Sequence, residues 1–123
     1  MDPAALAQRV KALCEGEEDT ITLMATLACE VHGADPRCSW TGFYRVVAPE
    51  QLKVGPYQGG HGCLTIPFGR GVCGAAARTR QAQLVPDVHA FPGHIACSTT
   101  TQSELVLPVQ VAQHSQGHRR VHA

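Results

Sequence analysis

Hydrophobic side chains in the first third of the chain recur every three to four residues, the spacing of one face of an α-helix. Residues 2–14 are predicted to form a short amphipathic helix, whose apolar positions are Leu6, Val10 and Leu13. A second stripe predicts a longer helix that begins near Asp19 or Thr20 and ends before Gly33; its members are Ile21, Met24, Ala25, Ala28 and Val31. Helical spacing also explains Cys29 as a core residue of this second helix.

The pattern changes after residue 38 to aromatic and β-branched residues, which are typical of strands. A strand over residues 39–46 and a hairpin partner over residues 52–57 are predicted, joined by a turn at Ala48-Pro49-Glu50. Shorter elements are expected further along, namely an extended piece at 65–67, a helix at 71–79, strands at 83–85 and 103–109, and an ordered loop at 86–97. This order of elements describes an α+β domain with a mainly antiparallel sheet.

Composition and charge narrow the class of protein. With 123 residues, 44% of them hydrophobic, the chain is long enough for one globular domain with a single core. Ten Lys and Arg balance ten Asp and Glu, and without a basic stripe nucleic acid is not expected as a partner. No apolar run approaches the roughly 20 residues of a membrane helix, and no export signal is recognised, so a cytoplasmic protein without a membrane partner is predicted.

Six cysteines are many for so short a chain and point to thiol chemistry. A secreted disulfide framework is the alternative, but it requires an export signal, so reactive thiols are the preferred interpretation. Zinc is not expected, because no Cys-x2-Cys pair and no matching histidine set frame a tetrahedral site. His114, His118 and His122 lie four apart, yet the Ser-Gln-Gly sequence among them argues against the helix that would align them.

Three segments carry a specific resemblance to a known family. They read WTGFY at residues 40–44, IPFGRGVCG at residues 66–74, and VPDVHAFPGHIAC at residues 85–97. Together with the strand at 103–108, they resemble the free methionine-(R)-sulfoxide reductases, and the match covers roughly residues 17–109, which is most of the chain. The resemblance implies a GAF-like domain, in which helices flank an antiparallel sheet and a small-molecule pocket lies under mobile loops.

The same resemblance implies roles for three cysteines. Cys97 would be the nucleophile, Cys63 the main resolving cysteine, and Cys73 a further cysteine for disulfide exchange. Attack of a thiolate on the sulfoxide releases methionine and leaves a sulfenic acid, which a second thiol converts to an intramolecular disulfide. No bound cofactor is expected; the implied partners are free methionine sulfoxide and external thioredoxin, which reduces the disulfide. The sequence does not show the oligomeric state, and a homodimer is possible.

Each of the other candidate residues has both a functional and a structural interpretation. Trp40 is either core or, by the resemblance, a pocket wall for the methyl group of the substrate. Glu104 is either a solvated charge or the acidic pocket residue that helps to protonate the sulfoxide oxygen. Cys73 is either a small packing residue or a redox thiol whose thiolate is favoured by the helix dipole. Asp87 and His89 are expected to hold turns of their loop rather than line the pocket.

The end of the chain departs from the family pattern. After Val109 the family continues to a strand that reads GVLDIDS, whereas residues 110–123 are polar, basic and aperiodic. Residues 1–109 are therefore predicted to be a GAF-like catalytic domain that lacks its C-terminal strands, and residues 110–123 a disordered tail of a truncated product. Ser98 stands where the family commonly has Asp. The predicted activity is L-methionine (R)-sulfoxide reductase; the alternatives are a noncatalytic GAF module that binds a small molecule, or an inactive fragment.

Overall fold

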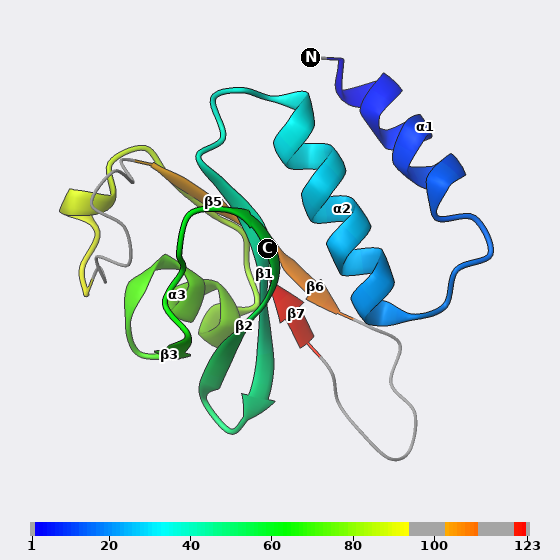
Figure 1. Ribbon diagram of the computed structural model, residues 1–123. Helices are drawn as coiled ribbons and strands as arrows, with labels where there is room; N and C mark the ends of the chain where they lie inside the picture. Colours follow the sequence, from blue (N-terminus) through cyan, green and yellow to red (C-terminus); the bar gives the residue numbers. More distant parts are fainter. Residues whose placement is uncertain (1, 94–102, 111–119, 123) are drawn as a thin grey trace. The chain divides into compact units, whose positions relative to one another are not determined.

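The structure is a computed structural model that describes residues 2–93, 103–110 and 120–122 (Figure 1). In chain order the elements are α1 (Pro3–Leu13), α2 (Thr20–Ala34), β1 (Trp40–Ala48), β2 (Gln51–Gly59), β3 (Thr65–Pro67), α3 (Gly71–Thr79), β4 (Gln83–Val85), the 3-10 helix η1 (Val88–Ala90), β5 (Glu104–Val106), β6 (Pro108–Gln110) and β7 (Arg120–His122). This content confirms the predicted α+β class. The described part of the chain contains no helix with both the length and the apolar character needed to cross a bilayer.

The chain divides into two compact units, which are described separately. The first comprises Met1–Phe43 and Gly55–Gly60, and the second comprises Tyr44–Val54 and His61–Ala123.

The first unit contains a helical hairpin of α1 and α2 (Figure 1). Each helix has an aspartate as its N-cap, because a carboxylate satisfies a backbone N–H that has no partner within the helix. For α2 a cap was predicted at Asp19 or Thr20, and Asp19 provides it. The carboxylate of Asp2 accepts a hydrogen bond of 3.0 Å from the N–H of Ala4. The carboxylate of Asp19 accepts one of 3.1 Å from the N–H of Thr22. An ion pair between Arg9 and Glu30 connects the two helices at their surface.

The buried face of α2 is narrower than its sequence predicts. Met24 and Ala28 are buried, whereas Ile21 is 62% exposed and Cys29 is an exposed free thiol. The interpretation of Cys29 as a core residue is therefore wrong. Residues four apart share a helix face, so burial follows Met24 and Ala28, and the next residue is rotated about 100° away.

The sheets of the structure are antiparallel in the pairings observed, as predicted. One sheet has the strand order β3-β2-β1-β7-β6, and β4 and β5 form a separate two-stranded sheet. The strand predicted over residues 103–109 is divided between them, since β5 pairs with β4 and β6 pairs with β7. Pro108 explains the division, because proline has no N–H for a continuous ladder and restricts the residue before it.

The structure differs from the predicted disordered tail at residues 120–122. These residues form β7, which lies between β1 and β6, with Tyr44 opposite His122 and Val109 opposite Val121. A polar segment can form such a strand because the hydrogen bonds of a ladder join backbone groups, which every residue except proline can supply in full.

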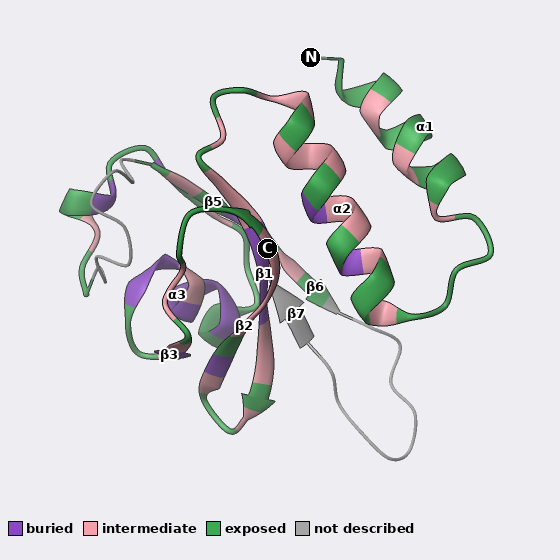
Figure 2. Ribbon diagram, in the orientation of Figure 1, coloured by how far each residue is buried: buried purple, intermediate pink, exposed green. Residues whose placement is uncertain are grey.

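The core of the second unit surrounds α3, most of which is buried (Figure 2). The central cluster contains Val72, Ala76, Val85, Val88 and Val106. Gly74 permits close packing, because a Cβ at this position would lie 2.7 Å from the carbonyl oxygen of Phe68. The helix covers the predicted residues 71–79 and ends at Arg80, which adopts a left-handed conformation with φ 57° and donates its N–H to the Ala76 carbonyl.

Candidate functional site

Cys63, the predicted resolving cysteine, lies half-buried between β2 and β3 of the second unit. Its backbone carbonyl accepts a hydrogen bond of 2.9 Å from the hydroxyl of Tyr44 on β1. The next residue is also fixed, because the carbonyl of Leu64 accepts a hydrogen bond of 3.1 Å from the N–H of Val54. The backbone at Cys63 is thus anchored from two strands. Tyr44 belongs to the WTGFY segment, but nothing in that segment indicates its contact with Cys63.

The redox state separates Cys63 from the other described cysteines. Cys63 is disulfide-bonded, whereas Cys14, Cys29, Cys38 and Cys73 are free thiols. The predicted nucleophile Cys97 lies outside the described residues, so its role stays a prediction.

Cys73 lies in the first turn of α3 and packs, half-buried, against the central cluster of the second unit. Burial of this thiol, followed by the negative charge of Glu104, raises its pKa from 9.0 to about 12. The predicted effect of the helix dipole, a favoured thiolate, is therefore wrong for this position. Desolvation and a neighbouring carboxylate both oppose ionisation of this thiol. Cys73 is a neutral thiol near pH 7.

Glu104 is half-buried at the start of β5, where it pairs with Val85 of β4. Its charge acts on the Cys73 thiol, so the structure brings together two predicted site residues that are distant in the sequence. The carboxylate is half-buried beside a thiol, so Glu104 is not simply a charge surrounded by solvent. The arrangement supports a site role for Glu104.

The loop after β4 is built as predicted at Asp87. The carboxylate of Asp87 caps η1 by accepting a hydrogen bond of 3.0 Å from the N–H of His89. At the end of this loop the N–H of Gly71 donates to the carbonyl of Gly93 at 2.8 Å. The loop that leads toward Cys97 is thus fastened to the start of the helix that carries Cys73.

Trp40, the predicted pocket wall, is half-buried at the start of β1 in the first unit. Its indole stacks on the ring of Tyr57 from β2, with centroids 5.3 Å apart and an interplanar angle of 23°. Trp40 is therefore half of a stacked aromatic pair rather than a fully buried core residue. Sequence reasoning missed Tyr57. Gly42 was the available signal, because a glycine inside a strand often marks a close approach of other groups.

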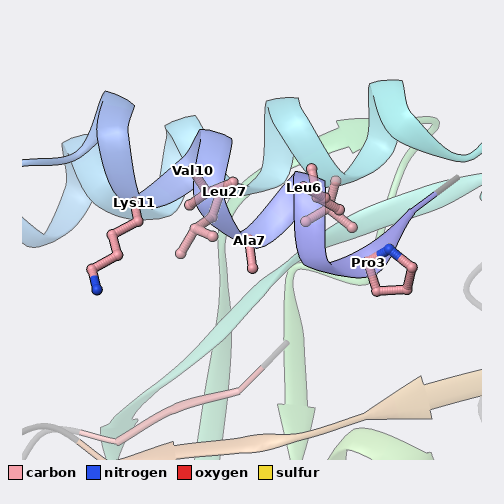
Figure 3. Close-up of a pocket in the computed structure, with 7 residues that line it drawn as sticks. Pro3, Leu6, Ala7, Val10, Lys11 and Leu27 are labelled. Carbon is pink, nitrogen blue, oxygen red and sulfur yellow. The ribbon is translucent and has the colours of Figure 1, made fainter.

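A hollow of about 390 Å³ lies between α1 and α2 in the first unit (Figure 3). It is lined by Pro3, Leu6, Ala7, Val10, Lys11, Leu27 and Val31. This lining contains no cysteine, histidine or carboxylate. The hollow therefore lacks the groups that thiol chemistry or sulfoxide protonation requires, and we do not assign the site to it.

No protein-family model matches the chain. The chain is 42% identical to Protein YtsP of Bacillus subtilis over 111 residues, which cover 89% of this chain and 68% of YtsP. With four curated relatives the match extends over 104 to 111 residues and covers 65 to 68% of each relative. The chain thus spans about two thirds of the length of these relatives.

Two solved structures resemble the chain over almost all of its length. A GAF sensor protein from Burkholderia vietnamiensis has a TM-score of 0.84 and 43% identity, and the similarity covers 97% of this chain and 75% of that one. The free methionine-R-sulfoxide reductase from Neisseria meningitidis, solved with its substrate, has a TM-score of 0.85 and 34% identity, covering 99% and 74%. The fold is that of a GAF domain. With this identity over this coverage, the chain belongs to the free methionine-R-sulfoxide reductase family.

Proposed function

We propose that this protein uses its own thiols to reduce free L-methionine (R)-sulfoxide to L-methionine. The observation that carries the proposal is the disulfide at Cys63 in a chain whose other described cysteines are free. A resolving thiol must be able to form a disulfide with a second thiol of the chain, and Cys63 meets this requirement. Membership of a family with a substrate-bound member supports the choice of substrate.

The reaction balances with two thiols of the chain. The Cys97 thiolate attacks the sulfoxide sulfur while the sulfoxide oxygen takes up a proton; the oxygen is transferred to Cys97 as a sulfenic acid, and methionine leaves. The Cys63 thiol then attacks this sulfenic acid, which releases water and forms a Cys63–Cys97 disulfide. Two thiols are oxidised and one sulfoxide is reduced. A dithiol protein such as thioredoxin returns the two electrons, and no bound cofactor is required.

The described residues have supporting roles in this scheme. Glu104 contacts the substrate and assists protonation of the sulfoxide oxygen. Trp40 offers an apolar face to the methyl group on sulfur. The hydrogen bond from Tyr44 keeps the backbone of Cys63 in place while its sulfur changes partners. Cys73, with its raised pKa, takes part at most in slower disulfide exchange.

The test follows NADPH oxidation, coupled through thioredoxin reductase and thioredoxin, with free L-methionine (R)-sulfoxide as substrate. Cys97→Ser should abolish turnover. Cys63→Ser should release about one methionine per chain and then stop in the presence of thioredoxin, because the sulfenic acid has no resolving thiol. Cys29→Ser is the matched control, since it removes an exposed free cysteine of α2, and it should keep the wild-type rate.

Equal rates for the wild-type protein and Cys97→Ser would overturn the proposal. Binding of the sulfoxide in a calorimeter, without any NADPH oxidation by the wild-type protein, would instead identify a noncatalytic GAF module.

A further inference from the structure

Trp40 and Tyr57 form an aromatic pair at one end of the β1–β2 hairpin, in the first unit. Their ring centroids lie 5.3 Å apart and the planes are inclined by 23°, which is an offset stack. Both residues are half-buried. Stacking covers one face of the indole, so a ligand can pack only against the opposite face or the ring edge.

Gly42 makes room for this stack. A Cβ at this position would overlap the Cβ of Tyr57 and would lie 2.8 Å from Cη2 of Trp40. Cη2 of the indole therefore lies where it would clash with the side chain of any larger residue at position 42. Glycine inside a strand weakens the strand, and close approach of another group is a recognised reason for its presence.

Gly59 fixes the backbone beside Trp40 in a similar way. It has a φ of +108°, which L side chains rarely adopt, and a Cβ there would overlap the carbonyl oxygen of Ser39 and lie 3.1 Å from the Trp40 Cα. Gly59 and Gly42 thus allow close packing against the backbone and the ring of Trp40, and Tyr57 stacks on its ring. Such close surroundings suit a side chain whose orientation matters.

The geometry points to Tyr57 as a positioning residue that sets the orientation of Trp40 for substrate binding. This inference rests on the proposed function, in which Trp40 packs against the methyl group of the sulfoxide. Tyr57 supports the far face of the indole and does not touch the reacting atoms. Its ring, and not its hydroxyl group, makes the stack, so Phe should replace it and aliphatic residues should not.

The test compares Tyr57→Ala, Tyr57→Leu and Tyr57→Phe with the wild-type protein. Trp40 is the single tryptophan of the chain, so intrinsic fluorescence reports on its surroundings alone. Quenching by acrylamide should increase in Tyr57→Ala, because one indole face becomes accessible, and should stay at the wild-type value in Tyr57→Phe. A thermal melt shows whether Tyr57→Ala folds. If it does not, Tyr57→Leu replaces it in the comparison, because leucine keeps apolar bulk at this position but cannot stack as an aromatic ring does.

The kinetic readout is the division between KM and kcat. In Tyr57→Ala and Tyr57→Leu the KM for methionine sulfoxide should rise roughly two- to tenfold, the factor that an aromatic pair is worth, with kcat changed by less than KM. Tyr57→Phe should restore both values. A folded Tyr57→Leu with wild-type KM would overturn the inference, as would a Tyr57→Phe variant as impaired as Tyr57→Ala. If the wild-type protein shows no turnover, the proposed function fails, and the quenching comparison still decides the positioning of Trp40.

Discussion

Cys73 should react slowly with alkylating reagents, and its rate should rise with pH far above neutrality. Burial and the charge of Glu104 raise the pKa of its thiol from 9.0 to about 12, so its thiolate fraction at pH 8 falls roughly a thousandfold. The nucleophilicity of a thiolate rises with its pKa, by about 20-fold over this range. The net slowing relative to an ordinary thiol is therefore about 50-fold from ionisation alone, and burial adds to it.

Iodoacetamide labelling followed by trypsin and mass spectrometry measures this rate at one residue. Cleavage after Arg70 and Arg78 releases residues 71–78, in which Cys73 is the single cysteine. The logarithm of the rate should rise with a slope close to one between pH 7 and pH 10, because the thiol is not yet half-ionised. A plateau within this range would refute the raised pKa.

Two controls separate the causes of the slow labelling. In Glu104→Gln the rate at pH 8 should increase but stay below that of an ordinary thiol, because burial is the larger cause of the shift. In protein unfolded by guanidinium the slowing should disappear. Slow labelling that persists after unfolding would contradict an origin in the fold.

Two pairs of substitutions test the packing by urea denaturation. Gly33→Ala should raise the free energy of unfolding by about 0.5–1 kcal/mol, because Gly33 lies inside α2 and an added Cβ meets nothing within 4 Å. Gly74→Ala should lower it by about 1–3 kcal/mol, because the Cβ would lie 2.7 and 2.8 Å from two carbonyl oxygens; effects of equal sign would contradict this packing. Val88→Ala, at a fully buried position, should lower it by about 2 kcal/mol. The control Val47→Ala, at a position 45% exposed, should change it by less than about 0.5 kcal/mol, and an equal loss in both variants would contradict the core.

Local signals predicted the helices well because the interactions that start them act over a few residues. Asp19 caps α2, where a cap at Asp19 or Thr20 was predicted, and the small residues of 71–79 form a helix with the predicted bounds. The end of α2 was less predictable, since the helix continues through Gly33. A glycine with negative φ can remain helical, so its presence alone does not define a helix end.

Burial was harder to predict than secondary structure, because it depends on partners that are distant in the sequence. Ile21 has the helical spacing of a core residue and is nevertheless exposed. The same limit applies to Cys73. The sequence correctly places Cys73 near the N-terminus of a helix. The pKa of its thiol is set by burial and by Glu104, a residue distant in the sequence that is positioned by the pairing of β4 with β5. The stack on Trp40 likewise requires Tyr57 from the neighbouring strand.

The environments of Cys63 and Cys73 assign them unequal parts in the proposed chemistry. A thiol that must attack a sulfenic acid needs a usable thiolate population near neutral pH and freedom to approach its target. Cys73 lacks the first, because burial and Glu104 keep it protonated. Cys63 is already oxidised to a disulfide, and Tyr44 holds its carbonyl rather than its sulfur, which leaves the side chain able to exchange partners.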